Sequence, residues 1–154
     1  MPEFIFKSRS SNVAGDKIYR DCVLLTEGSY QDSTSMRVHF YDGSVLKKCA
    51  TNWKSNYLNI NHSQHPLDRI GYVENQRWNG KSILADLRIL PITSRAKDII
   101  NLIDNGLVEN LSIEAEIDRE FDKRINMMKV TNIEFLGCAI VTDPACKDAV
   151  IKVR

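Results

Sequence analysis

The strongest secondary-structure signal in this chain is a strict alternation of apolar and polar residues, Leu111-Ser112-Ile113-Glu114-Ala115-Glu116-Ile117. Successive side chains of a β-strand point to opposite faces of the sheet. The four apolar residues therefore share one face, while Ser112 and the two glutamates share the other. The stretch predicts a strand with one buried face, and it places the hydroxyl of Ser112 on the polar face.

The segment before this strand has the pattern of an amphipathic helix. Its apolar residues recur at the spacing of one helix face: Ala96, Ile99, Ile100 and Ile103. Thr93 or Ser94 can cap the start of the helix, and Asn105-Gly106 can end it, because glycine accepts the left-handed conformation that follows a last turn. A helix is therefore expected over residues 94–105.

The remaining elements are mostly strands. Strands are expected over residues 23–25, 36–41, 70–74, 82–89, 127–135, 138–142 and 149–153, with a polar loop over 27–33 and a short helix over 45–53. Asn79-Gly80 predicts a hairpin between two of the strands. Strands outnumber helices, so the expected fold is α+β and mainly β. One domain spanning residues 1–154 is expected, with a small β-barrel-like sheet and one or two helices packed on it.

Composition excludes several classes of function. The 154 residues include 21 Lys+Arg and 20 Asp+Glu, which gives a formal net charge of +1, and 43% of them are hydrophobic. This chain is too apolar for disorder and lacks the basic excess of a typical nucleic-acid binder or anionic-membrane binder. It contains no apolar run of the roughly 18 residues that a membrane span needs. The segment Met1–Lys7 is too short and acidic for a signal peptide, so we expect a cytosolic protein with neither a nucleic-acid nor a membrane partner.

The cysteines and histidines do not predict a metal site or a cofactor. The four cysteines show no CxxC spacing: Cys22, Cys49, Cys138 and Cys146. Buried reduced thiols are therefore expected. His62 and His65 are three residues apart but have no obvious third metal ligand nearby.

Ser112, His62 and His65 are the residues that could carry chemistry. A serine hydroxyl becomes a nucleophile when an adjacent base accepts its proton, and histidine is the usual base. The chain has no GxSxG motif. Spacing alone favours a surface serine on a half-buried strand, with Glu114 and Glu116 beside it on a solvated face. It also favours two exposed loop histidines.

Four motifs occur in an informative order around the predicted helix. They are Leu58-Asn59-Ile60-Asn61-His62, the "P-x-x-x-I-G-x-V" segment Pro66–Val73, the "L-S-I" segment Leu111–Ile113, and the segment Phe135–Ala145, which is similar to "V-S-L-V-x-x-P-A". In this order, the chain resembles the prohead (capsid maturation) serine proteases of tailed bacteriophages, which share a fold with the herpesvirus assemblins. The resemblance runs from about Leu58 to Val150.

The resemblance implies roles for the matching residues. Ser112 would be the nucleophile and His62 the general base, with His65 as the rival base in the same loop. Family members often carry the third, acidic residue at a position that is Gly137 in this chain. The resemblance therefore leaves two acids, Glu134 and Asp143, as equal candidates for orienting the imidazole.

The resemblance also implies a function. It predicts a serine endopeptidase, without a cofactor, that cleaves scaffold and major capsid proteins inside the assembling procapsid in the host cytoplasm. Weak self-association into a homodimer is expected from the assemblins. The alternative is a catalytically inactive virion or assembly module on the same fold, and the missing acid at Gly137 favours that alternative. Glu114 and Glu116 favour it too, because negative charge beside Ser112 opposes an oxyanion.

Overall fold

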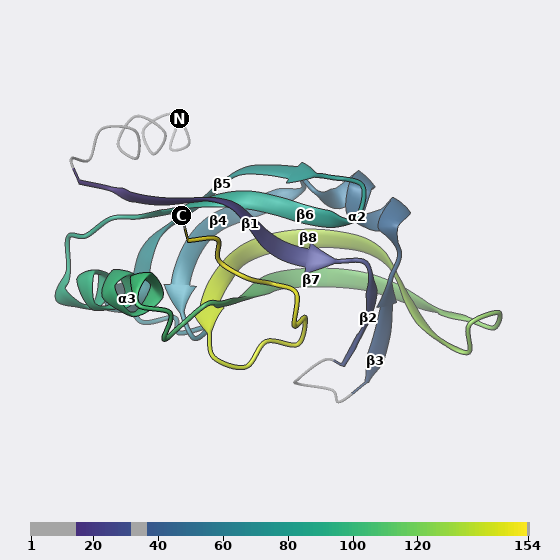
Figure 1. Cartoon of the computed structure of the whole chain (residues 1–154). Helices are drawn as coiled ribbons and strands as arrows, with labels where there is room; N and C mark the ends of the chain where they lie inside the picture. Colours follow the sequence, from purple (N-terminus) through teal and green to yellow (C-terminus); the bar gives the residue numbers. More distant parts are fainter. Residues whose placement is uncertain (1–14, 32–36, 154) are drawn as a thin grey trace.

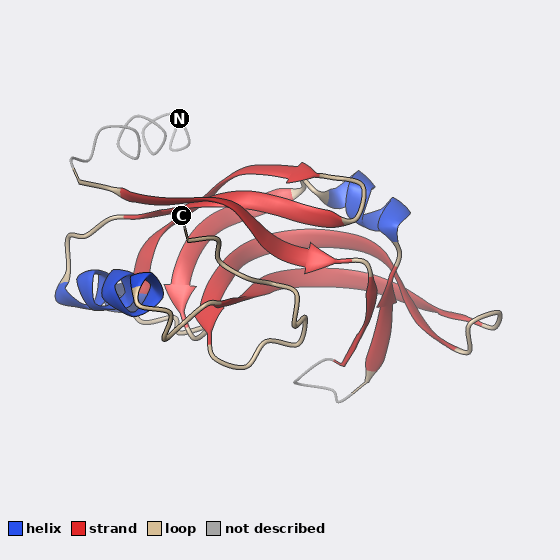
Figure 2. Ribbon diagram, in the orientation of Figure 1, coloured by secondary structure: helices blue, strands red, loops and turns tan. Residues whose placement is uncertain are grey.

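The chain forms a single curled sheet with helices at its ends (Figures 1 and 2). The computed structural model describes residues 15–31 and 37–153. The strands are β1 (Lys17–Thr26), β2 (Gly28–Gln31), β3 (Val38–Tyr41), β4 (Trp53–Ile60), β5 (Arg69–Trp78), β6 (Ser82–Ile89), β7 (Asn110–Asp122) and β8 (Met127–Val141). The helices are α2 (Gly43–Cys49), α3 (Ser94–Asp104) and the 3₁₀ turn η1 (Pro66–Asp68). The expected α+β, mainly β fold is confirmed.

Strand β8 is the centre of the sheet. The strand order is β1-β6-β5-β4-β8-β3-β2, and β7 pairs with the other edge of β8. Strands β3 and β4 run parallel to β8, whereas β7 runs antiparallel to it and forms a long hairpin with it. Strand β8 therefore lies between β4 and β7, and this neighbourhood positions the site described below.

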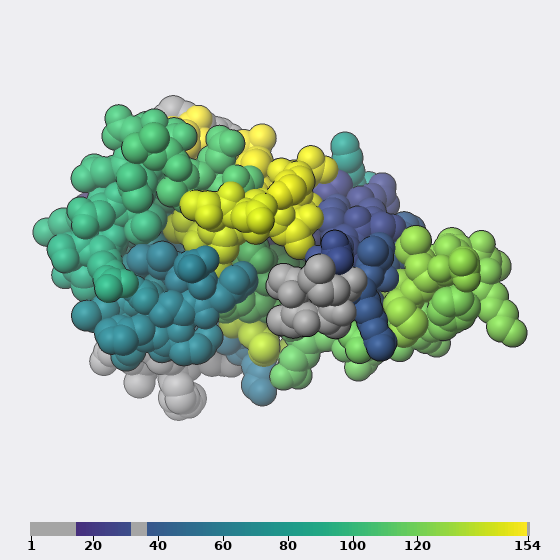
Figure 3. Space-filling view, turned by 90° about the horizontal axis from the view of Figure 1, so that it is seen from below, coloured from purple at the N-terminus to yellow at the C-terminus, as the bar shows by residue number. Residues whose placement is uncertain are grey.

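The C-terminal segment closes one end of the curled sheet. Val150 exchanges two backbone hydrogen bonds of 3.0 Å with Val23 of β1 and forms a bridge with Asn110 of β7. Leu111 also donates its backbone N–H to Ala149, at 3.1 Å. The segment crosses the face seen in Figure 3, where it is drawn in yellow. It joins β1 to β7, two strands that do not pair with each other along their length.

The two helices follow from local sequence. Helix α3 begins after Thr93, whose side chain accepts a hydrogen bond from the backbone N–H of Ala96, and it ends before Asn105. The expected helix and its cap are therefore confirmed. Helix α2 buries its apolar residues at the opposite end of the sheet (Figure 1). None of the described helices is long and apolar enough to span a membrane.

Several predicted elements have different bounds in the structure. The helix expected over 45–53 is α2 and ends at Cys49, because Trp53 instead opens β4 and stacks on Phe135 with ring centroids 4.6 Å apart. The strands expected over 127–135 and 138–142 are one strand, β8, which a bulge at Leu136 interrupts without ending it. The expected hairpin of β5 and β6 is confirmed.

Two other predictions near the chain ends are wrong. Residues 149–153 do not form a strand, because the segment crosses between β1 and β7 and pairs with each only at Val150. The loop expected over 27–33 contains the short strand β2, while residues 32 and 33 and the expected strand residue Met36 lie outside the described residues. The strand expected over 23–25 is longer and forms β1.

Candidate active site

Ser112 lies in β7, directly opposite Ala139 of β8. It is the residue after Leu111, whose backbone is bonded to the C-terminal segment. Ser112 is therefore fixed by pairing on one side and by the closing segment next to it on the other. This rigid placement is what a nucleophile needs, since its approach to a substrate depends on a fixed geometry.

His62 lies in a tight turn directly after β4. Asn61 and His62 have φ angles of 55° and 60°, and Ser63 donates its backbone N–H to Ile60 at 3.0 Å. Two positive φ angles with this hydrogen bond describe a turn of type I′. Asn61 also donates its N–H to Ile140 of β8, at 2.9 Å, which ties the turn to the centre of the sheet.

The turn brings His62 across β8 to β7. Neighbouring strands lie about 4.8 Å apart, so roughly 10 Å separates β4 from β7. Nε2 of His62 lies 3.0 Å from Oγ of Ser112, and Nδ1 lies 2.8 Å from Oε2 of Glu114. A neutral imidazole with its proton on Nδ1 satisfies both contacts, because it then donates to the carboxylate and accepts from the hydroxyl. The arrangement is a serine–histidine–carboxylate relay.

The carboxylate of Glu114 reaches His62 because Gly137 has no side chain. Gly137 of β8 pairs with Glu114 of β7 on one side and with Tyr57 of β4 on the other. A Cβ atom on Gly137 would lie 2.9 Å from Oε1 of Glu114 and 2.9 Å from the carbonyl oxygen of Tyr57. The position where the resemblance predicts an acid is thus empty, and a carboxylate from the adjacent strand lies over it.

The other predicted site residues lie elsewhere. His65 precedes η1, where its Nδ1 accepts the backbone N–H of Leu67 at 3.2 Å. Glu134 pairs with Glu116 further along the hairpin, and Asp143 forms an exposed ion pair of 2.8 Å with Lys147. Among the described residues, the carboxylate hydrogen-bonded to His62 is that of Glu114. The structure therefore differs from the expectation that Glu134 or Asp143 would contact the imidazole.

Sequence reasoning missed Glu114, although one signal pointed to it. Glu114 lies two residues after Ser112 and therefore on the same face of the strand. The alternation by itself predicts that this polar face is solvated. In the structure the Glu114 side chain is only 19% exposed, because the β4–His62 segment covers it.

The electrostatics of the site keep Glu114 ionised. The hydrogen bond from His62 lowers the pKa of the Glu114 carboxyl below its ordinary value, and burial acts in the opposite direction. A hydrogen bond from Asn59 and the positive charge of Arg69 lower this pKa further. A charged carboxylate next to Nδ1 stabilises an imidazolium, which forms when His62 accepts a proton.

Burial makes two of the described cysteines, Cys22 and Cys138, unreactive as nucleophiles. All four are free thiols and buried. Burial raises the pKa of the Cys22 thiol to about 11, and it raises that of Cys138 as well. A buried thiol with a raised pKa is inert. Within the described parts of the chain, no group of three or more His, Cys, Asp or Glu side chains could hold a metal ion.

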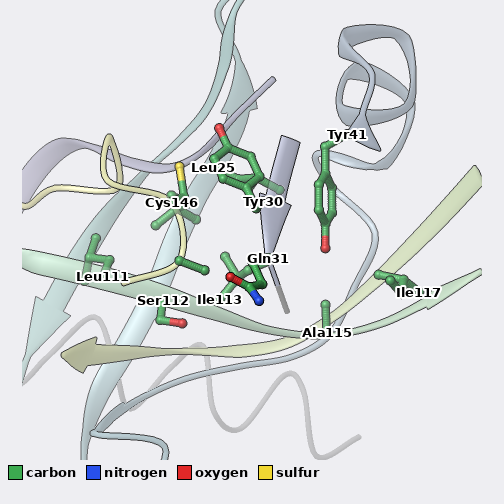
Figure 4. Close-up of a pocket in the computed structure, with 12 residues that line it drawn as sticks. Leu25, Tyr30, Gln31, Tyr41, Leu111, Ser112, Ile113, Ala115, Ile117 and Cys146 are labelled. Atoms are coloured by element: carbon green, nitrogen blue, oxygen red, sulfur yellow. The ribbon is translucent and has the colours of Figure 1, made fainter. Parts of the chain in front are cut away.

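An open cavity of about 200 Å³ lies beside Ser112 (Figure 4). It lies where β1 and β7 separate, next to the closing C-terminal segment. Its lining residues carry no charge, and they combine apolar side chains with polar groups: Leu24, Leu25, Tyr30, Gln31, Tyr41, Leu111, Ser112, Ile113, Ala115, Ile117, Ala145 and Cys146. Leu111, Ile113, Ala115 and Ile117 line it from the apolar face of β7, whereas the Ser112 hydroxyl belongs to the face that carries Glu114.

The curled sheet, with this site around strand β8, is a protease-like fold. A similar solved structure is that of the bacteriophage T4 capsid assembly protease gp21, with a TM-score of 0.56 and 11% sequence identity. The match covers 86% of this chain and 100% of that one. It confirms, for the fold, the resemblance to the phage prohead proteases. No protein-family model and no curated protein sequence matches the chain.

Proposed function

We propose that this protein is a serine endopeptidase in which Ser112 is the nucleophile, His62 the general base and Glu114 the acid that orients the base. The observation that carries the proposal is the continuous relay of two hydrogen bonds, 3.0 Å from Ser112 to His62 and 2.8 Å from His62 to Glu114. Groups from two strands that flank β8 converge in this relay. A solvated polar face does not require such convergence.

The reaction follows from the positions of these groups. Oγ of Ser112 attacks the carbonyl carbon of a peptide bond while Nε2 of His62 takes the hydroxyl proton. The tetrahedral intermediate collapses, His62 gives its proton to the leaving amine, and the acyl group remains on Ser112. A water molecule then attacks this ester with His62 again as base, which releases the acid and restores the serine.

Glu114 does not act against this chemistry, although its charge lies near Ser112. Its Oε2 contacts Nδ1, on the side of the ring opposite to the serine. Its charge therefore acts on the imidazolium and stabilises it when the oxyanion forms. The third group that resemblance places on Gly137 is supplied by Glu114 in this proposal.

The substrates that we infer are the scaffold and capsid proteins of a tailed phage, cleaved inside the procapsid. The similar solved structure is described as a capsid assembly protease, and the open cavity beside Ser112 has room for part of a polypeptide.

Labelling with a fluorophosphonate tests the proposed function. We expect intact mass spectrometry to find one adduct on the wild-type protein and none on Ser112→Ala, because only an activated serine reacts. A second labelled residue, or equal labelling of Ser112→Ala, would show that Ser112 is not the nucleophile. A wild-type protein that folds but takes no label would instead favour the inactive assembly module.

Enlarging a cavity residue is expected to separate substrate binding from chemistry. Ala115 lines the cavity (Figure 4), and the hydrogen bonds of the relay join Ser112, His62 and Glu114. We expect Ala115→Phe to slow cleavage of the phage scaffold protein by about 100-fold, since a small displacement of a substrate from a nucleophile has effects of this size. Fluorophosphonate labelling, measured on the same sample, is expected to change little. Equal loss of both activities would mean that the substitution disturbs the relay and that the cavity has not been tested as a binding site; unchanged cleavage would exclude the cavity.

A further inference from the structure

The side-chain amide of Asn59 lies against the carboxylate of Glu114. Asn59 belongs to β4 and is 6% exposed. Its Nδ2 lies 3.1 Å from Oε1 and 2.9 Å from Oε2 of Glu114, and His62 bonds to the same Oε2 at 2.8 Å. Both oxygens of the carboxylate are therefore held, and the carboxylate cannot turn away without breaking these contacts.

The orientation of this amide is determined by Glu114. Oδ1 of Asn59 is buried and has no hydrogen-bond partner among the described residues. A buried acceptor without a partner is unfavourable, so an amide free to choose would turn its oxygen toward a donor. Turning the amide here would place Oδ1 against a carboxylate. The amide of Asn59 thus donates to Glu114, although this orientation leaves its own Oδ1 without a hydrogen bond among the described residues.

We propose that Asn59 is a positioning residue, which holds both oxygens of Glu114 so that Oε2 stays aimed at Nδ1 of His62. The inference rests on the proposed function and assigns a role that the sequence motifs do not indicate. Its Nδ2 bonds to Glu114, whereas the Ser112 hydroxyl bonds to His62, so Asn59 acts through Glu114.

The surroundings explain why Glu114 needs such a partner. Its neighbours are the imidazole of His62 in the turn after β4 and the charged Arg69 at the start of β5, whose guanidinium stacks on the Tyr57 ring at 3.9 Å. The titratable group beneath it is the buried Cys138 thiol of β8, which is neutral. Burial favours the neutral form of a carboxyl group. Donors from Asn59 counter that tendency and keep the oxygens in place.

Replacement of Asn59 tests the proposal. We expect Asn59→Leu, which keeps the volume and removes the donor, to slow fluorophosphonate labelling of Ser112 by about 10- to 100-fold, as for other residues that orient a reacting group. Asn56→Leu, on the same strand as Asn59, is the matched control: it removes a bond of 3.0 Å from Nδ2 of Asn56 to the backbone carbonyl of Val73 in β5. The control is expected to label at the wild-type rate.

A spectroscopic measurement separates positioning from a purely structural role. The Nδ1 proton of His62, bound to a carboxylate, is expected to give a downfield NMR resonance in the wild type and in Asn56→Leu, and to be lost or exchange-broadened in Asn59→Leu. Full labelling of a folded Asn59→Leu, with this resonance intact, would overturn the proposal for Asn59 while leaving the proposed protease intact. No label on the wild type would contradict the protease itself.

The wild-type protein offers a test that does not depend on a variant folding. Because the Asn59 amide is bonded to Glu114, its Nδ2 resonances are expected to move as the Glu114 carboxyl is protonated. Resonances that stay constant across that titration would overturn the proposal. The matching amide of Asn56, bonded to a backbone carbonyl, should remain constant.

Discussion

His62→Gly is expected to slow labelling of Ser112 by about 10⁴- to 10⁶-fold, the size of effect found when the base of a serine protease is removed. Among the residues that the structure describes, the base hydrogen-bonded to Oγ of Ser112 is His62. Glycine is the informative replacement, because His62 has a φ of 60°, a conformation that glycine adopts without strain. The turn should therefore persist, and the loss of activity will not be a loss of fold.

Added imidazole is expected to restore part of the labelling of His62→Gly, since it can occupy the vacated space and accept the proton. Circular dichroism and the melting temperature should match those of the wild type. His65→Ala is the matched control. It removes only the acceptor for the Leu67 N–H, so labelling is expected to continue at the wild-type rate. Rapid labelling of His62→Gly together with slow labelling of His65→Ala would make His65 the base.

Glu114→Gln is expected to lower the labelling rate by about 10⁴-fold, as in proteases whose orienting carboxylate becomes an amide. The carboxylate accepts the Nδ1 proton and leaves the lone pair of Nε2 toward Ser112. The amide of glutamine can donate to Nδ1, and the imidazole proton then lies on Nε2. Nε2 can then no longer accept the proton of the Ser112 hydroxyl.

Two further amide replacements serve as controls for Glu114→Gln. Glu134→Gln and Asp143→Asn alter the acids that the sequence suggested, and both lie away from His62. We expect them to label within about two-fold of the wild type, because surface substitutions rarely matter more than a few tenths of a kcal/mol. A large loss of labelling in either control, with full activity in Glu114→Gln, would indicate that Glu134 or Asp143 orients the imidazole.

Gly137 of β8 carries no carboxylate, and Glu114 of the next strand supplies it for a simple physical reason. A carboxylate on β8 and one on β7 would occupy the same space over the central strand, so only one can be present. With glycine on β8, the Cβ position stays empty and Glu114 fills the space. The imidazole receives its carboxylate from the same strand that carries the serine.

The local sequence pattern was enough to predict those helices and strands that can be recognised without knowing which strands pair with them. Alternation defined β7, apolar spacing and the Thr93 cap defined α3, and the loop with Asn79-Gly80 defined the hairpin of β5 and β6. The same local reading, with the family motifs, singled out Ser112 and His62, which the structure brings to 3.0 Å.

The acidic residue of the site, Glu114, and the residue that positions it, Asn59, could be identified only from the strands that lie next to each other. Glu114 and Asn59 are 55 residues apart in sequence, and they meet only because β8 lies between β4 and β7 with a glycine at the crossing. Alternation assigns a residue to a face of its strand but does not say which distant strand covers that face. Strand order and register arise from packing of the whole sheet. They place His62 and Asn59 over the polar face of β7, which local sequence alone predicts to be solvated.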